Sequence, residues 1–308
     1  MMSEQAVISL EGVRRSYGGA HGGGFELGPI DLDIESGHIV AVVGPNGAGK
    51  STLFQILMGL IHPDAGNVSL FGLDHPQDEV EIKRKIGYVP ERALGHDDMS
   101  AKALGEFVSY WYPHWNEELY RELLARYAVD PRKRFDKLST GDQRRLSFAL
   151  ALARGAELLL LDEPTAGVDP VGRKEMLGDI SRFVHLGAGA KTVVFATQVM
   201  EEAKRVADHI AFLVDGELLG PFGKNALLKE WKTFWLEEEP DGDVLGLIEV
   251  HGGSPVRIVT DSPEETREAL SSQNTRIVGE GTVDLEEILS YLVRRSTERR
   301  IKSSRAGE

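Results

Sequence analysis

The chain has 308 residues, of which 41% are hydrophobic and 27% are charged, a balance that is typical of folded proteins and excludes an intrinsically disordered chain. The formal net charge of −14 disfavours nucleic acid as a partner, and the absence of cysteine excludes disulfides and thiol-based metal sites. No apolar run approaches the roughly 20 residues of a membrane-spanning helix, and residues 1–5 lack the basic and apolar start of a secretory leader, so we expect a cytosolic protein that reaches any membrane through another chain.

Three short, wholly apolar runs predict the central strands of a parallel sheet. They cover residues 39–43, 158–161 and 192–195, and each ends where polar residues begin. Strands without polar alternation are buried on both faces, as in sheets that helices cover on both sides. Because ligands of such α/β folds bind beyond the carboxyl ends of the strands, we expect the functional residues there.

A phosphate-binding loop follows the first of these strands. Residues 44–52 read Gly-Pro-Asn-Gly-Ala-Gly-Lys-Ser-Thr, and a helix-like segment comes next. The glycines let backbone N–H groups point at phosphates, and the start of the helix favours negative charge. We expect Lys50 to reach the β- and γ-phosphates, Ser51 to bind Mg²⁺ and Thr52 to contact a phosphate oxygen. The predicted nucleotide-binding residues of the loop are Gly44, Asn46, Gly47, Gly49, Lys50, Ser51 and Thr52.

The strand pattern stops in the middle of the chain. Apolar residues at helical spacing, as in residues 117–127, predict a helical subdomain inserted at about residues 92–155. Four aromatic residues crowd this subdomain: Trp111, Tyr112, Trp115 and Tyr120. Two interpretations stay open for them, namely packing between helices or a groove that receives a short helix of a membrane partner.

Two acidic residues end the second apolar strand. Asp162 is placed to hold the water shell of Mg²⁺. Glu163, next to it, can polarise the water that attacks the γ-phosphate. This pair therefore predicts hydrolysis of a nucleotide and not only binding.

The last part of the chain predicts a domain boundary. A strand, the two-residue turn Asp215-Gly216 and a second strand close a first domain of residues 1–226. Beyond it, residues 256–260 alternate like a half-buried strand, and helices are expected to begin at Ser262-Pro263 and at Asp284. We predict a small α+β domain at residues 227–308 that regulates the protein or supports a dimer.

Two further segments occur in the order that is typical of one family. Residues 138–143 (Leu-Ser-Thr-Gly-Asp-Gln) resemble the signature Leu-Ser-Gly-Gly-Gln of the ABC ATPases, and residues 166–169 resemble their D-loop. By the same resemblance, Tyr17 matches the aromatic residue on which adenine stacks. Glu91 stands at the position of the Q-loop glutamine, where a carboxylate can also coordinate Mg²⁺, and Gln198 stands at the position of the switch histidine. The resemblance covers roughly the first three-quarters of the chain.

The resemblance implies an α/β P-loop NTPase fold of the ABC ATPase type, with an inserted helical subdomain and a small α+β C-terminal domain. It implies ATP and Mg²⁺ as ligands, with Glu163 and Gln198 at the catalytic positions. Two subunits, either a homodimer or a heterodimer, would pack head to tail so that Ser139 and Gly141 of one close on the nucleotide of the other.

The partners implied by the resemblance are transmembrane permease subunits, which would hold a peripheral protein at the cytoplasmic face of the cell membrane. Residues 111–127 and 137–145 are similar to the YtrB-like group of bacterial exporter ATPases. Residues 283–289 resemble the C-terminal helix of exporter subunits. Both similarities favour export.

Besides Glu91, three residues depart from the family pattern. Thr140 replaces a glycine, Asp142 replaces a glutamine and Gln198 replaces a histidine. Thr140 would cost backbone freedom if its φ were positive, whereas Asp142 can stabilise the start of a helix. We expect slow turnover from a working site.

Two other classes of protein are alternatives. Soluble ABC-family ATPases that act on the ribosome normally carry two ATPase domains and basic linkers, whereas this acidic chain has one phosphate-binding loop. A DNA-repair ATPase needs a long coiled coil between the loop and the signature, and the roughly 90 residues there leave no room for it.

Overall fold

The computed structural model describes residues 6–18, 24–92, 97–185, 190–240, 242 and 244–306, so residues 1–5 lie outside the described part. The chain divides into two compact units, Met1–Pro221 and Phe222–Glu308, and each is described by itself. The sequence-based boundary after residue 226 stays a prediction.

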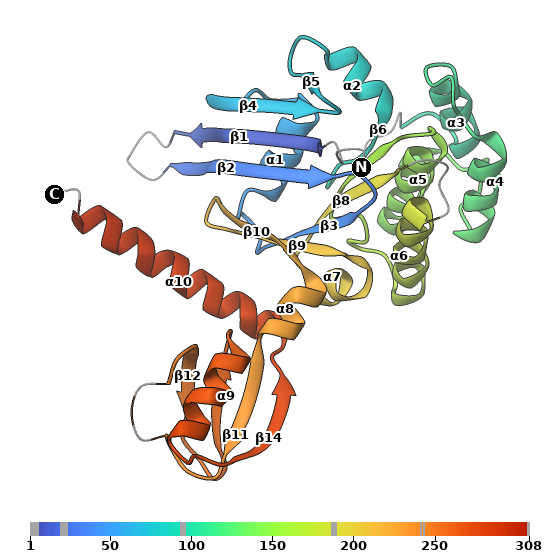
Figure 1. The fold of residues 1–308 in the computed structure, drawn as a ribbon. Coiled ribbons are helices and arrows are strands. Elements are labelled where there is room, and N and C mark those ends of the chain that lie inside the picture. The colour runs from blue at the N-terminus through green and yellow to red at the C-terminus, as the bar shows by residue number, and fades with distance from the viewer. Residues whose placement is uncertain are drawn as a thin grey trace. The chain divides into compact units, whose positions relative to one another are not determined.

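A six-stranded sheet forms the centre of the first unit (Figure 1). Its strands in spatial order are β10 (Glu217–Gly223), β9 (His209–Val214), β3 (Ile39–Val43), β8 (Thr192–Thr197), β7 (Leu158–Asp162) and β6 (Ile86–Val89). Strand β3 pairs in parallel with β8 and β9, and β7 pairs in parallel with β6 and β8. Val43 lies beside Thr197 and Asp162 lies beside Ala196, so the carboxyl ends of the strands meet at one edge. The predicted α/β class is confirmed.

A second, antiparallel sheet shares a core with the first. Its strands are β2 (Phe25–Glu35), β1 (Ala6–Tyr17), β4 (Ala65–Leu70) and β5 (Leu73–Asp74). Helix α1 (Lys50–Leu57) packs between the two sheets, because its Leu53 and Phe54 belong to the same buried cluster as Ile8 of β1 and Val42 of β3. This sheet was not predicted from the sequence, although residues 30–34 of β2 alternate between apolar and acidic, a pattern that indicates a half-buried strand.

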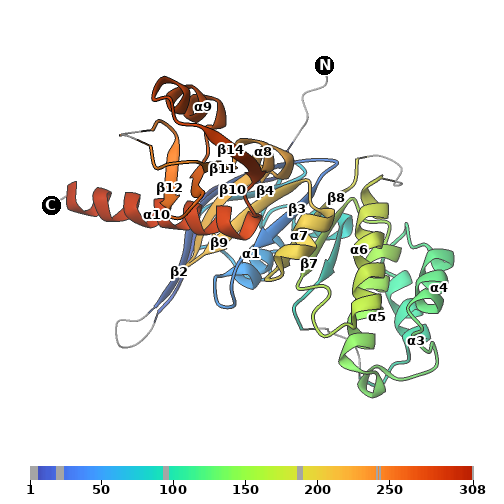
Figure 2. The ribbon, with the colours of Figure 1, turned by 90° about the horizontal axis from the view of Figure 1, so that it is seen from below.

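The predicted helical insertion is confirmed. It contains α3 (Ala101–Ser109), α4 (Glu117–Arg126), a 3-10 turn (Phe135–Lys137) and α5 (Thr140–Ala153), and Figures 1 and 2 both show these helices grouped together. The side chains of Ser100, Asn116 and Ser139 accept hydrogen bonds from backbone N–H groups and so cap the three α-helices. The remaining helices of this unit are α2 (Glu79–Lys85), α6 (Pro170–His185) and α7 (Met200–Val206).

The aromatic residues of the insertion divide into two kinds. Tyr120 is buried, and its hydroxyl donates a hydrogen bond to Ala101 O at 2.6 Å. Trp111 is 62% exposed, so it does not pack in the core. The packing interpretation therefore fits Tyr120, and Trp111 is left on the surface.

The second unit is an α+β domain, as predicted. Its sheet has the order β12 (Leu247–His251), β13 (Val256–Thr260), β11 (Lys232–Leu236) and β14 (Ile277–Thr282). Its helices are α8 (Lys224–Glu230), α9 (Pro263–Ser272) and α10 (Leu285–Ala306). The strand expected at residues 256–260 is present as β13, but the prediction that it is half-buried is wrong. Four of its five residues are buried, and it lies between two neighbouring strands of the sheet.

Within the described residues, no helix has both the length and the apolar character that crossing a membrane requires.

Candidate functional site

The loop between β3 and α1 is shaped by glycines. Gly49 caps the helix with φ 105°, a left-handed conformation that favours glycine. A Cβ atom on Gly44 would lie 2.0 Å from the carbonyl oxygen of Leu213, so no larger residue fits there. The backbone N–H groups at the start of α1 are left without a side-chain cap, and they can bind an anion.

Lys50 is buried beside this loop. Its Nζ donates hydrogen bonds to Gly44 O at 2.8 Å and to Pro45 O at 3.1 Å. The same Nζ lies 3.3 Å from Oε1 of Glu163. The ammonium group is thus held between the loop and the acidic end of β7, where a phosphate can contact it.

The two acidic residues after β7 are also buried. Asp162 is 1% exposed and Glu163 is 8% exposed. Burial raises the pKa of both carboxyls, while the nearby Lys50 opposes that rise. Oδ1 of Asp162 has no hydrogen-bond partner, and a buried carboxylate oxygen without a partner is costly unless a ligand satisfies it.

Glu163 adopts a backbone conformation that is unusual for its residue type. Its φ is 48°, in the left-handed region, and conformations of this kind cost on the order of 1–3 kcal/mol. Its backbone N–H donates to Ala196 O at 3.1 Å, which ties the end of β7 to β8. Such strain is typical of functional positions.

The side chains near the loop fit a divalent cation. Ser51 Oγ donates a hydrogen bond to Glu91 Oε2 at 3.2 Å, and the Ser51 hydroxyl also opposes the rise in the pKa of Asp162 that burial causes. A hydroxyl and two carboxylates are the hard oxygen ligands that Mg²⁺ prefers. The described residues contain no cluster of three or more histidines, cysteines or acidic residues that could hold a metal. A nucleotide-bound Mg²⁺ does not need one, because phosphate oxygens and waters supply its other ligands.

A pocket of about 310 Å³ opens over the loop. Tyr17 and Phe25 are the aromatic residues in its lining, with ring centroids 6.4 Å apart, and Glu91 and Glu163 are the acidic ones. Phe25 was missed by sequence reasoning, since only the pairing of Tyr17 with Phe25 across β1 and β2 brings it here. Asn46, Gly47, Gly49, Lys50, Ser51 and Thr52 complete the lining.

The ring of Tyr17 has a cation over it. Arg15 places its guanidinium 5.3 Å from the ring centroid, and its NH1 donates to Asp64 Oδ1 at 2.6 Å. Asp64 also accepts a hydrogen bond from the backbone N–H of Ser16 at 2.7 Å. Asp64 therefore fixes the end of β1 from which Tyr17 projects.

The signature segment begins α5 and does not line this pocket. Ser139 caps the helix by accepting a hydrogen bond from the N–H of Asp142 at 3.1 Å. A Cβ on Gly141 would lie 3.1 Å from Gly167 O, so the segment packs closely against the D-loop. Thr140 lies in the helix and is not among the residues with positive φ, so the backbone cost considered for it does not arise.

Gln198 is exposed at the carboxyl end of β8, and it is not among the described residues that line the pocket. The catalytic position expected for Gln198 therefore stays a prediction.

Arg144 was not predicted as a site residue. It is 8% exposed, and its NH1 donates to Pro90 O at 2.7 Å. Burial lowers the pKa of Arg144, against the charges of Asp162, Glu91 and Glu163, which raise it. Tyr88 nearby has its pKa raised to about 12, first by burial and then by Asp162 and Glu91. Arg144 directly follows the signature segment, which marks it as a candidate. Spacing in the sequence, however, could not show where its side chain points.

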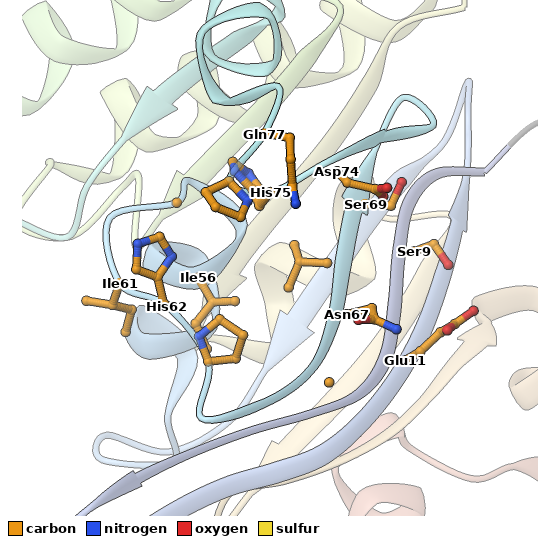
Figure 3. Close-up of a pocket in the computed structure, with 15 residues that line it drawn as sticks. Ser9, Glu11, Ile56, Ile61, His62, Asn67, Ser69, Asp74, His75 and Gln77 are labelled. Atoms are coloured by element: carbon orange, nitrogen blue, oxygen red, sulfur yellow. The ribbon is translucent and has the colours of Figure 1, made fainter.

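A second pocket, of about 580 Å³, shares no lining residue with the first. Figure 3 shows Ser9 and Asn67 on one side of it and His62 and His75 on the other. His75 Nε2 lies 3.2 Å from Leu57 O, and burial lowers the pKa of its ring. Nothing at this pocket resembles the phosphate-binding arrangement.

Comparisons with known proteins agree on one family. A sequence profile described as "ABC transporter" matches residues 27–166. Nod factor export ATP-binding protein I of Rhizobium sp. (strain N33) is 32% identical over 83% of this chain and 80% of its own length. ABC transporter ATP-binding protein YtrB of Bacillus subtilis (strain 168) is 28% identical over 85% of this chain and 91% of its own length.

A longer relative and a solved structure extend these comparisons. Glucosylceramide transporter ABCA12 of Homo sapiens is 32% identical over 68% of this chain, which spans only 8% of that transporter. A dimeric ATP-binding cassette in a post-hydrolysis state, bound to ADP and Pi, superposes with a TM-score of 0.61 at 25% identity, and covers 70% of this chain and 99% of that chain.

Proposed function

The chain belongs to the ABC transporter family, and from this premise we propose that it binds and hydrolyses ATP to drive a separate membrane permease that exports a substrate. The observation that carries the proposal is the convergence of Lys50, Asp162 and Glu163 at the carboxyl edge of the sheet, where Asp162 Oδ1 lacks a partner. The similarity to an export protein over 83% of the chain supports the direction of transport.

In this proposal the loop and Tyr17 hold the nucleotide. The base stacks on the ring of Tyr17, and the phosphates lie on backbone N–H groups of Gly47, Gly49 and the start of α1. Thr52 contacts a phosphate oxygen. Lys50 exchanges its bonds to Gly44 O and Pro45 O for the β- and γ-phosphates, so its positive charge stays in the site throughout.

Ser51, Glu91 and Asp162 are the proposed residues that hold Mg²⁺. The ion would neutralise negative charge on the phosphates when it is bound. Asp162 Oδ1 is suited to this position because no protein donor occupies it.

Glu163 is the proposed general base. Burial raises the proton affinity of its carboxylate, which favours acceptance of a proton from the attacking water. Its position between Lys50 and the strained turn keeps the carboxylate at the phosphate end of the pocket. Gln198 is assigned the role of a donor to the γ-phosphate from the neighbouring strand.

Assembly is part of the proposal. Ser139 and Gly141 of one subunit close on the nucleotide of the other in a homodimer, or in a heterodimer with a related ATPase. The pair lies at the cytoplasmic face of the cell membrane through its permease subunits, and the second unit regulates or supports the dimer. The relatives above are transport proteins, which favours transport over the ribosome and DNA-repair alternatives.

Reconstitution tests this function. The chain should be purified with the integral membrane protein that copurifies with it and placed in vesicles. ATP should then be hydrolysed faster with the permease than without it, and Lys50→Ala should abolish the reaction. A wild-type protein that hydrolyses no ATP alone or with its permease would refute the proposal.

A further inference from the structure

Arg144 reaches from the signature helix to the segment that carries Glu91. It lies in the second turn of α5, which begins after Ser139, and its guanidinium bonds the carbonyl oxygen of Pro90 at 2.7 Å. Pro90 directly precedes Glu91. Arg144 is a buried cation with 8% of its surface exposed, and Glu91, the residue after its partner Pro90, lines the pocket over the loop.

The charges around Arg144 are unequal. Asp162, Glu91 and Glu163 all act electrostatically on its guanidinium. Lys50 is a second cation here, and its Nζ is already shared between Glu163 and the loop carbonyl of Gly44. These three carboxylates therefore face two cations before any triphosphate, itself strongly negative, enters the pocket.

We propose that Arg144 is a positioning residue whose charge balances Glu91, so that a carboxylate at this position does not repel the nucleotide. The inference rests on the proposed function, because it assumes that ATP binds at this loop. Coulomb interactions between partly buried charges are several times stronger than in water. Removing the charge of Arg144 should thus weaken triphosphate binding. The size of this loss of affinity should depend on whether residue 91 is charged. A purely packing role would not depend on that charge.

The test measures binding without hydrolysis. A fluorescent ATP analogue is titrated in excess EDTA into the folded full-length chain, into Arg144→Gln and Arg144→Lys, and into each arginine variant combined with Glu91→Gln. Glutamine keeps a donor for Pro90 O and removes the charge. We expect Arg144→Gln to weaken binding about tenfold and Arg144→Lys to stay within about threefold of wild type. In the Glu91→Gln background, Arg144→Gln should cost less than about threefold.

Arg145→Gln is the matched control. It removes the same charge from the next residue of α5, but its partners are Asp142 and Asp169. Its effect should be the same whether residue 91 is glutamate or glutamine.

Equal losses for Arg144→Gln in both backgrounds would overturn the inference. If Arg144→Gln alone does not fold, the double variant must fold, because it lacks the charge that Arg144 balances; failure of both would also overturn it. A wild-type chain that binds no nucleotide would instead refute the proposed function.

Discussion

The carboxylate of Glu202 accepts a hydrogen bond at 2.5 Å from the hydroxyl of Thr165, a residue that is 37 positions away in the chain. Its other oxygen accepts a hydrogen bond from the hydroxyl of Thr197 at 2.8 Å. Thr165 lies two residues after Glu163, and Thr197 directly precedes Gln198. Glu202, which is 3% exposed, therefore links the two segments that carry the proposed catalytic groups.

Replacing Glu202 should disturb both segments. Glu202→Ala leaves two buried hydroxyls without an acceptor, so we expect the free energy of unfolding to fall by about 2–4 kcal/mol. Glu202→Gln keeps one acceptor and should cost less. Urea unfolding compares the stability of the two variants with that of the wild type. In steady-state kinetics, kcat should fall and KM should change less. An alanine variant with wild-type stability and kcat would contradict the link.

Lys50 and Glu163 should separate binding from hydrolysis. Lys50→Ala removes the phosphate-contacting cation, so ATP binding should be lost. Glu163→Gln removes the proposed base and should leave binding intact while kcat falls by at least about a hundredfold. Size-exclusion chromatography with ATP and Mg²⁺ should then show a trapped dimer. Normal hydrolysis by Glu163→Gln would disprove the assigned role.

Asp162 should lower the free energy of unfolding of the nucleotide-free protein. Burial raises the pKa of its carboxyl, so folding disfavours the charged form. Asp162→Asn should therefore stabilise the nucleotide-free protein at neutral pH, by on the order of 1 kcal/mol. As the pH falls through the pKa of the folded state, the wild-type carboxyl also becomes neutral and the difference should disappear. Urea unfolding near pH 7 and near pH 4 tests the trend, which a less stable variant at both values would contradict.

Gln198→His should accelerate hydrolysis. Histidine can donate to the γ-phosphate and change its protonation as negative charge develops, whereas glutamine cannot titrate. An effect on transition-state charge of this kind predicts a gain in kcat of about tenfold with little change in KM. Equal or lower activity in purified dimers would mean that the site has been rebuilt around glutamine.

Removal of the second unit should spare nucleotide binding. A chain that ends at residue 226 keeps every residue of the pocket over the loop. ATP binding should stay measurable, while the stability of the dimer or its coupling to the permease changes. Calorimetry measures ATP binding by the truncated chain, and light scattering measures its dimerisation. Loss of ATP binding in a folded truncation would show that the boundary is wrong.

The parts of the site that could be predicted are those encoded by neighbouring residues. Lys50 and Ser51 belong to a loop whose sequence specifies its own shape, and Asp162 and Glu163 end a strand that is apolar throughout. Arg144, Glu202 and Phe25 depend on contacts between distant segments, and no local pattern reveals where such side chains point. Trp111 and Tyr120 show the same limit, since spacing alone did not tell the exposed ring from the buried one.

The pairing of Tyr17 with Phe25 has a consequence for which nucleotide the pocket accepts. Rings contact a nucleobase through its flat face, and every purine offers one, whereas adenine and guanine differ at their hydrogen-bonding edges. Among the described residues that line this end of the pocket, Tyr17 and Phe25 offer ring faces, so a base bound there as proposed would be selected mainly by stacking. GTP should thus compete with ATP nearly on equal terms, and which of the two is consumed in the cell would follow their relative concentrations.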